Sequence, residues 1–218
     1  DPEFMNKARA GKPESIRKCI GCMYCRERLL GNAMPVECSL NPRLGREYRY
    51  RWQDLQKNGN SRPVVVVGGG PGGMSAAYFL SRSGVDVTVF ERRDALGGIV
   101  RHVIPGFRIP GEAIDNDVRL MEAMGVKVEL NTEVKNVQEL FAQGFTHVIL
   151  ATGAWQKGSA GLEYGEEHNV IEFLEAAKKA PDTLNLGRHV VVIGGGNTAM
   201  DAARAALRAG AKSSTCLL

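Results

Sequence analysis

Short apolar runs alternate with amphipathic segments along most of the chain. The run Pro-Val-Val-Val-Val at 63–67 is uninterrupted, which is typical of a strand buried on both faces of a parallel sheet. A helix is expected from Gly72 to about Ser83 and a second strand at 85–90. This order of strand, helix and strand predicts a parallel β-α-β unit.

The alternation continues to the C-terminus. We expect, in order, a helix with Ile114, Val118 and Met121 on one face, strand 126–130, helix 137–143, strand 148–151, helix 170–179, strand 189–193, helix 197–209 and strand 213–218. The run Val-Val-Val-Val-Gly-Gly-Gly at 64–70 is echoed by Val-Val-Val-Ile-Gly-Gly-Gly at 190–196. Two nucleotide-binding folds are therefore expected to begin in this chain.

The first part of the chain has a different character. Residues 6–62 show little periodicity and many turn formers, so we expect irregular loops with short helical turns and a polar linker at 57–61. Asp1-Pro2-Glu3-Phe4 precede Met5 and look like a cloning remnant. The expected organisation is a remnant at 1–4, a cysteine segment with its linker at 5–62, a first nucleotide-binding domain at 63–160, a connection at 161–187 and the truncated start of a second domain at 188–218.

Four of the five cysteines lie close together. Cys19, Cys22, Cys25 and Cys38 have the spacing C-x2-C-x2-C-x12-C. Three thiolates within seven residues can hold three corners of a cubane cluster, and a fourth from a distant loop completes it. A 4Fe-4S cluster is the favoured interpretation. Structural zinc is the alternative, although zinc sites usually use two separated C-x2-C pairs.

Composition and charge narrow the function classes. The net charge is +4, and the basic excess lies in the first 62 residues, where Arg17, Lys18, Arg26 and Arg28 flank the cysteines. Positive charge there would favour thiolates, although a solvated basic surface explains each residue equally well. The basic residues form no clean run, so nucleic acid is not an expected partner. No apolar run reaches the roughly 18 residues of a membrane helix, and clustered cysteines suit a reducing compartment, so a cytoplasmic protein is expected.

The first glycine-rich turn has the context of a dinucleotide site. Gly68-x-Gly70-x-x-Gly73 follows a strand and opens a helix, and Glu91 ends the next strand. The glycines allow the turn, the approach of the pyrophosphate and close helix packing, and Glu91 would accept hydrogen bonds from the ribose. The candidate residues of this turn and the next strand end are Gly68, Gly70, Pro71, Gly73, Glu91 and Arg92.

The second glycine-rich turn repeats the pattern with one position changed. Gly194-x-Gly196-x-x-Ala199 again lies between strand and helix, and Ala199 is small enough for the third position. The turn resembles the second glycine turn of two-dinucleotide flavoenzymes, and this resemblance implies NAD(P)H as its ligand, with Asn197 and Thr198 among its contacts. The residue that selects NADH or NADPH follows the next strand, so the choice between them is not predicted. Asp201 is expected to compensate the helix dipole.

Further short motifs resemble the glutathione-reductase type of FAD-binding domain. They are Gly97-Gly98, after the second strand, and Ala151-Thr152-Gly153, after the strand at 148–151. The resemblance implies that the glycine pair passes near the flavin phosphates and that Val134 contacts the adenine through its backbone. No cysteine pair follows Gly98, so disulfide chemistry there is excluded. The expected fold is α/β: an incomplete FAD/NAD(P)-binding Rossmann-like parallel sheet, preceded by an irregular iron-sulfur segment.

Two larger families share these features. The cysteine segment, with Cys38-Ser39-Leu40-Asn41-Pro42-Arg43, resembles the region after the barrel in old-yellow-enzyme-like iron-sulfur flavoproteins of the 2,4-dienoyl-CoA reductase and trimethylamine dehydrogenase type. The regions at 97–110 and 194–201 look more like the glutamate synthase small subunit. The first resemblance implies an upstream barrel domain with FMN, absent here, or a partner subunit, and the chain is therefore expected to be a fragment. A homo-oligomer is also compatible.

The resemblances imply an electron-transfer function. NAD(P)H would reduce FAD, and electrons would pass to the 4Fe-4S cluster and on to an FMN or partner site, with the protein supplying position and potential. The isolated chain is expected to be weakly active or inactive. The alternative is a non-catalytic nucleotide-binding or docking module with a structural metal cluster. The physiological substrate is not predicted.

Overall fold

The chain forms two compact units in a computed structural model. The structure describes residues 1, 3–41, 43–49, 56–156, 158, 161, 163–164 and 167–217. The first unit comprises Asp1–Leu96 and Pro110–Thr152, and the second comprises Gly97–Ile109 and Gly153–Leu218. The polypeptide therefore passes into the second unit, returns to the first and leaves it again after Thr152.

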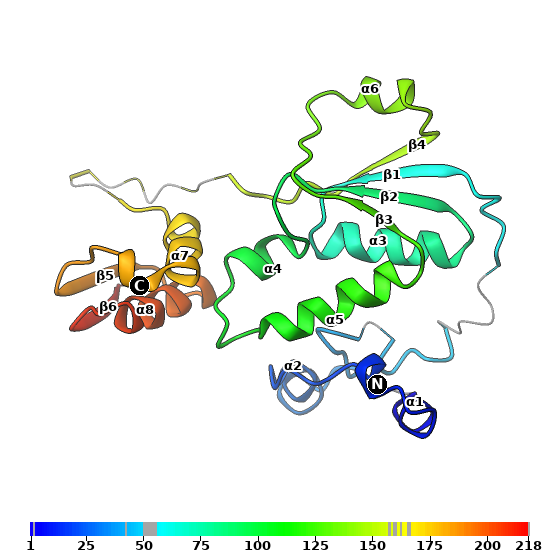
Figure 1. The fold of residues 1–218 in the computed structure, drawn as a ribbon. Coiled ribbons are helices and arrows are strands. Elements are labelled where there is room, and N and C mark those ends of the chain that lie inside the picture. The colour runs from blue at the N-terminus through cyan, green and yellow to red at the C-terminus, as the bar shows by residue number, and fades with distance from the viewer. Residues whose placement is uncertain are drawn as a thin grey trace. The chain divides into compact units, whose positions relative to one another are not determined.

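The first unit is built on a four-stranded parallel sheet in the order β3-β2-β1-β4 (Figure 1). Its strands are β1 (Pro63–Val67), β2 (Asp86–Phe90), β3 (Lys127–Glu129) and β4 (His147–Leu150). Val66 of β1 is paired with Val89 of β2 and with Ile149 of β4. The parallel sheet and the α/β class predicted from the apolar runs are confirmed.

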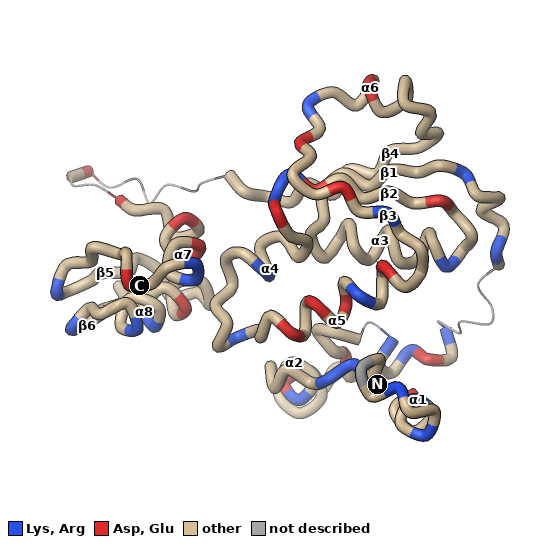
Figure 2. The backbone as a smooth tube through the Cα atoms, viewed as in Figure 1, with Lys and Arg blue, Asp and Glu red and all other residues tan. Residues whose placement is uncertain are grey.

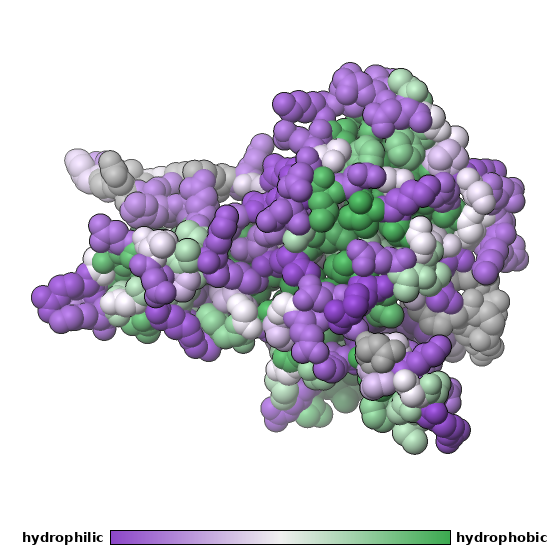
Figure 3. All heavy atoms as spheres, viewed as in Figure 1, coloured by the Kyte–Doolittle hydropathy of each residue, from purple (hydrophilic) through white to green (hydrophobic). Residues whose placement is uncertain are grey.

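Helices cover both faces of this sheet. One face packs on α3 (Pro71–Arg82) and α5 (Gly111–Glu122), with Met74, Ala77 and Met121 buried against Val66 and neighbouring strand residues. The other face holds Val65 and Val67 against Leu140 of α6 (Val137–Ala142). Alternate valines of β1 thus enter opposite cores, which explains why its sequence is apolar throughout. Hydrophobic residues are exposed at the surface over part of the sheet in this view (Figure 3).

The N-terminal segment packs against α5. It contains α1 (Phe4–Arg9), η1 (Pro13–Ser15) and α2 (Tyr24–Arg26), separated by loops, and the π-helical turn η2 (Glu27–Gly31), which continues directly from α2. Arg17 Nη2 lies 3.2 Å from Asp117 Oδ1, and Lys18 Nζ lies 2.7 Å from Glu112 Oε1. Both acidic partners belong to α5, along which acidic positions predominate in Figure 2. Ion pairs therefore connect this segment to α5.

The polar stretch before β1 is hydrogen-bonded to the turn between α3 and β2. Gly59 N donates to Ser83 O at 2.9 Å, and Ser61 N donates to Gly84 O at 2.9 Å. A Cβ on Gly59 would lie 2.6 Å from the carbonyl carbon of Gly84. This approach requires glycine at position 59 and fixes where the chain enters the sheet.

The second unit contains a two-stranded parallel sheet, β5 (His189–Ile193) and β6 (Ser213–Leu217). Its helices are α4 (Gly98–His102), α7 (Val170–Lys179) and α8 (Asn197–Arg208), with the 3-10 turn η4 (Pro181–Thr183) after α7. A small core joins Val103, Leu174, Ala202 and Ala205. The signals for β5, α7, α8 and β6 are confirmed, and α4 and η4 are additional elements.

The apolar run of β5 echoes that of β1, but β5 is not buried on both faces. Val191 is 60% exposed and Ile193 is 53% exposed, whereas Val192 packs into the core with α7 and α8. Within the described residues, helices cover only one face of this two-stranded sheet, so alternate side chains face outward. None of the helices in the described part of the chain combines the length and apolarity needed to cross a membrane.

Candidate functional site

The ends of β1, β2 and β4 meet at one edge of the first sheet. Gly68 N donates to Phe90 O at 2.8 Å, and Ala151 N donates to Val67 O at 2.8 Å. Gly68 has a φ of 106°, and a Cβ there would overlap the carbonyl oxygen of Ala151. The first glycine turn is therefore packed against the chain that leaves β4, and only glycine fits its first position.

The start of α3 lies beside this turn. Gly70 is the N-cap residue, Pro71 follows it, and no side chain caps the helix. A Cβ on Gly73 would overlap the carbonyl oxygen of Gly68, whereas the space around Gly72 is open within 4 Å. Helix and turn thus approach at the distance that a glycine-rich anion site requires, with the positive end of the helix dipole available to a phosphate.

Glu91 is the buried carboxylate of this edge. Its Oε2 accepts a hydrogen bond from Gly69 N at 2.7 Å, and its Oε1 accepts one from Arg93 N at 2.9 Å. The residue is 6% exposed, whereas the neighbouring Arg92 is exposed. Glu91 therefore holds the backbone of the glycine turn in this structure. Its expected role toward a ribose uses the same position and stays a prediction.

The remaining candidates of the first unit line the same end of the sheet. Thr132 N donates to Glu91 O at 2.9 Å, which brings the loop containing Val134 to the end of β2. Val134 packs against the cluster of Val65, Val67 and Leu140. Thr152 is exposed after β4. The structure thus gathers the candidates of the first unit at one edge, where ligands of open parallel sheets bind.

Three further candidates belong to the second unit. Gly97 and Gly98 precede and begin α4 with φ values of 118° and 53°, and Gly153 has a φ of 73°. Positive φ explains why glycine occupies these positions. Their predicted proximity to flavin phosphates stays a prediction.

The second glycine turn has the geometry of the first in a looser form. Gly194 has a φ of 120°, and a Cβ there would lie 3.7 Å from the Cβ of Ala199, which is ordinary contact. Gly196 caps α8 without a side-chain hydrogen bond, and Asn197 and Thr198 in its first turn are exposed. The N-terminus of α8 is therefore also uncapped, as a phosphate-binding helix end requires.

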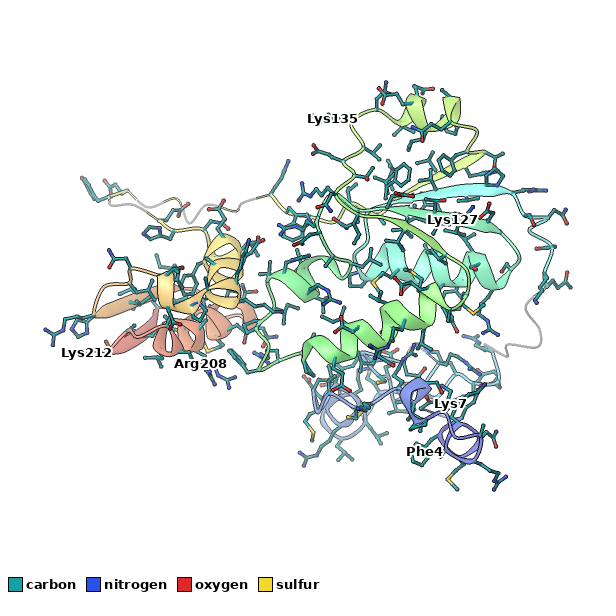
Figure 4. All side chains as sticks on the ribbon, in the orientation of Figure 1. Phe4, Lys7, Lys127, Lys135, Arg208 and Lys212 are labelled. Atoms are coloured by element: carbon teal, nitrogen blue, oxygen red, sulfur yellow. The ribbon has the colours of Figure 1, made fainter. Side chains whose placement is uncertain are left out.

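Asp201 has a partner that sequence reasoning missed. Its Oδ1 accepts a hydrogen bond from Arg108 Nε at 2.6 Å. The guanidinium groups of Arg204 and Arg208 lie 4.5 and 4.3 Å from the centre of the Phe107 ring. Arg208 projects from α8 in Figure 4. The segment at 97–109 is therefore attached to α8 by an ion pair and by cation–π contacts.

The ion pair gives a measurable contribution to the second unit. We expect Asp201→Asn to lower the free energy of unfolding by about 1 kcal/mol, a value kept small because the Arg108 side chain is 39% exposed and solvent screens the pair. Chemical denaturation measures the change. Asp182→Asn, an exposed carboxylate in η4 of the same unit, is the control and should change stability by less than about 0.5 kcal/mol. Equal effects of both variants would contradict the assignment.

The cysteine segment forms a tight loop. Gly21 and Met23 have φ values of 67° and 59°, so left-handed residues separate Cys19 from Cys22 and Cys22 from Cys25. Cys22 Sγ lies 3.4 Å from Ser39 Oγ, which is adjacent to Cys38. All four thiols are free. In the described part of the chain, no three His, Cys, Asp or Glu side chains are grouped tightly enough to hold a single metal ion.

The loop nevertheless fits an iron-sulfur cluster in its donors. Gly21 N donates to Cys19 Sγ at 3.3 Å, the type of hydrogen bond that tunes cluster potentials. The Nε atoms of Arg17 and Arg28, on either side of the three-cysteine run, are buried with no acceptor among the described residues. Backbone turns with left-handed residues surround many bound anions and iron-sulfur groups. The four thiols, the left-handed turns between them and the N–H donor to Cys19 Sγ therefore suit an anionic iron-sulfur cluster.

Among the described residues, Glu112 and Lys178 have pKa values that depart from their ordinary values. The hydrogen bond and charge of Lys18 lower the pKa of Glu112 on the surface of α5. Burial, followed by the charge of Arg101, lowers the pKa of Lys178. Lys178 Nζ donates to Ile104 O at 2.5 Å, so this lysine holds the backbone after α4 within the second unit.

Comparisons with known proteins agree with this geometry. The family of pyridine nucleotide-disulphide oxidoreductases matches residues 62–217. The protein YgfK of Escherichia coli (strain K12) is 46% identical over 166 residues, which cover 74% of this chain and 16% of YgfK. The glutamate synthase [NADPH] small chain of the same strain is 34% identical over 170 residues, covering 71% of this chain and 36% of that one.

Solved structures extend the likeness to the cysteine segment. A 2-naphthoyl-CoA reductase complex has a TM-score of 0.82 and 27% identity, over 99% of this chain and 32% of that chain. Histamine dehydrogenase from Rhizobium sp. 4-9 has a TM-score of 0.79 and 27% identity, over 99% of this chain and 33% of that chain. Both predicted resemblances are confirmed.

The chain spans between 16% and 36% of the two curated relatives described above and about a third of the two solved chains. The matched residues contain both glycine turns, Glu91 and every strand of both sheets. The chain belongs to the pyridine nucleotide-disulphide oxidoreductase family.

Proposed function

We propose that this chain is the electron-transfer module of an NAD(P)H-dependent flavin and iron-sulfur oxidoreductase. FAD binds at the edge formed by Gly68–Gly73 and Glu91, and NAD(P)H binds at the N-terminus of α8. The observation that supports this most is the first edge itself, where an uncapped helix, a crowded glycine turn and a buried carboxylate meet. A phosphate and a ribose need these three features together.

The protein supplies position rather than acid-base chemistry. Bound FAD would supply hydride acceptance from NAD(P)H and release of single electrons, and a 4Fe-4S cluster would supply one-electron transfer. Glu91 holds the backbone of the glycine turn at Gly69, which positions the turn for the pyrophosphate. The cluster would be held by Cys19, Cys22, Cys25 and Cys38, and the N–H of Gly21, which donates to Cys19 Sγ, would stabilise charge on that sulfur.

The electrons leave through a domain or subunit outside this chain. Relatives of this chain include the NADP(+)-dependent formate dehydrogenase subunit beta of Moorella thermoacetica, of which the match covers 23%. They also include the NADPH-Fe(3+) oxidoreductase subunit beta of Geobacter sulfurreducens, of which it covers 25%. By their names these proteins work beside other subunits. An FMN-bearing barrel or a partner subunit is the recipient that the proposal requires.

The test is an anaerobic spectroscopic titration of the purified chain. The protein is reconstituted with FAD, iron and sulfide, the bound groups are quantified, and NADH or NADPH is added. We expect one FAD and four irons per chain, with flavin absorbance lost slowly, in a single reduction, on addition of one of the two nucleotides, in keeping with the weak activity expected of the isolated chain. Dithionite serves as the control that the flavin and the cluster can be reduced.

Other outcomes would contradict the proposal. A chain that binds FAD but loses no flavin absorbance with either nucleotide would favour a docking module that holds the nucleotide structurally. A colourless chain that binds one zinc ion would exclude the iron-sulfur route altogether.

A further inference from the structure

Glu37, the residue before Cys38, connects the two parts of the cysteine segment. Its Oε1 lies 3.3 Å from Arg28 Nη2 and also accepts a short hydrogen bond from Arg46 Nη2. Its Oε2 accepts a hydrogen bond from Tyr24 OH at 3.3 Å. One carboxylate therefore has three partners within a segment that contains little regular structure.

The positions of these partners show which parts of the cysteine segment Glu37 connects. Tyr24 directly precedes Cys25, and Arg28 follows Cys25 by three residues. Arg46, by contrast, lies after Cys38. Glu37 therefore ties the chain around the third cysteine to the chain around the fourth. The backbone adds one more link here, because Met34 N donates to Arg28 O at 2.8 Å.

The charges explain why a carboxylate is needed at this position. The side chains of Glu37 and Arg28 are 26% and 20% exposed, so water screens their attraction only in part. A neutral residue at 37 would leave the guanidinium groups of Arg28 and Arg46 close together without a counter-charge. The Nε of Arg28 already lacks an acceptor among the described residues, so a second uncompensated group would open the loop.

We propose that Glu37 is a positioning residue that holds Cys38 in place, beside Cys22 and Cys25, for assembly of the iron-sulfur cluster. The inference rests on the proposed function in one respect, namely that these cysteines take up a cluster. Glu37 touches neither the cluster nor a substrate. It acts through Tyr24, Arg28 and Arg46, which set the distance between the two cysteine-bearing loops.

The test compares Glu37→Gln with Glu27→Gln. The first substitution keeps the shape of the side chain but removes its charge, whereas Glu27 is an exposed carboxylate in the same segment and gives a control with the same change of charge. After anaerobic reconstitution we expect the iron and sulfide content of Glu37→Gln to fall at least about threefold, with FAD content unchanged. Glu27→Gln should match the unchanged chain in iron, sulfide and FAD.

A second measurement needs no cluster. In the iron-free chain, a short bis-maleimide should join Cys22 to Cys38, as mapped by peptide mass spectrometry. We expect Glu37→Gln to lower this yield at least about threefold and Glu27→Gln to leave it unchanged. If no variant binds iron but this difference is present, the proposed function fails and the positioning role of Glu37 stands.

The opposite outcomes overturn the inference. Equal cluster content and equal cross-linking in the two variants would show that Glu37 is a surface ion pair without effect on Cys38. Loss of FAD together with the cluster in Glu37→Gln would show that the residue maintains the fold of the whole first unit instead.

Discussion

Gly73→Ala is expected to destabilise the first unit by about 3 kcal/mol, because the added methyl group has no space. A Cβ at this position would overlap the carbonyl oxygen of Gly68, which is backbone and cannot rotate away. Gly68 is itself fixed by the hydrogen bond from its N–H to Phe90 O. The helix and the glycine turn must therefore separate, and the same movement disrupts the edge at which FAD is proposed to bind.

Gly72→Ala provides the matched control for this experiment. Both glycines lie in the first turn of α3, but a Cβ at Gly72 would have no neighbour within 4 Å. Alanine at 72 is expected to be neutral or to stabilise by up to about 1 kcal/mol, since it restricts the unfolded chain. Urea denaturation and FAD titration of both variants check the prediction. Equal stabilities would show that α3 and the turn are not in close contact.

The regular elements could be predicted because their signals are local. The strand expected at 63–67 is observed as Pro63–Val67, and the helix expected at 170–179 as Val170–Lys179. Continuous apolar runs and helical spacing decide such elements within a few residues of sequence. Burial of the outer face of β5 could not be judged in this way, because it depends on what else packs there.

Contacts between segments that are far apart in the chain could not be predicted from the sequence. Nothing in the pattern at 97–109 indicated that it groups with the second unit, because Phe107 and Arg108 lie in a loop without periodicity. Arg108 meets Asp201 across 93 residues of chain. The close approach of Gly59 to Gly84 is equally non-local. A glycine within a polar stretch is read as flexible until the structure shows what lies against it.

The candidate sites divide in the same way. The glycine turns could be located because their spacing between strand and helix is itself the signal. The hydrogen bond from Gly69 N to Glu91 was not predicted, because it depends on how far the turn folds back over β2. Cysteine spacing indicated four ligands, but it did not indicate Glu37, which resembles any other acidic residue until its three partners are seen together.

Glu91→Gln is expected to destabilise the first unit by about 2 kcal/mol and to weaken FAD binding about tenfold. The carboxylate accepts two hydrogen bonds, from Gly69 N and Arg93 N, in a buried position. An amide has one acceptor oxygen, so its NH2 group must face one of these N–H donors. A buried donor left without an acceptor costs about 1–3 kcal/mol, and the loosened turn loses the geometry proposed for the pyrophosphate.

Glu129→Gln is the control that separates geometry from charge. Glu129 ends the neighbouring strand β3, its side chain is exposed, and the substitution removes the same charge from the same edge of the sheet. We expect its stability and its FAD affinity to remain close to those of the unchanged chain, as measured by denaturation and by quenching of flavin fluorescence. If both variants lose FAD affinity equally, general electrostatics rather than the two hydrogen bonds of Glu91 controls the site. If neither loses it, the buried carboxylate organises the turn without taking part in nucleotide binding.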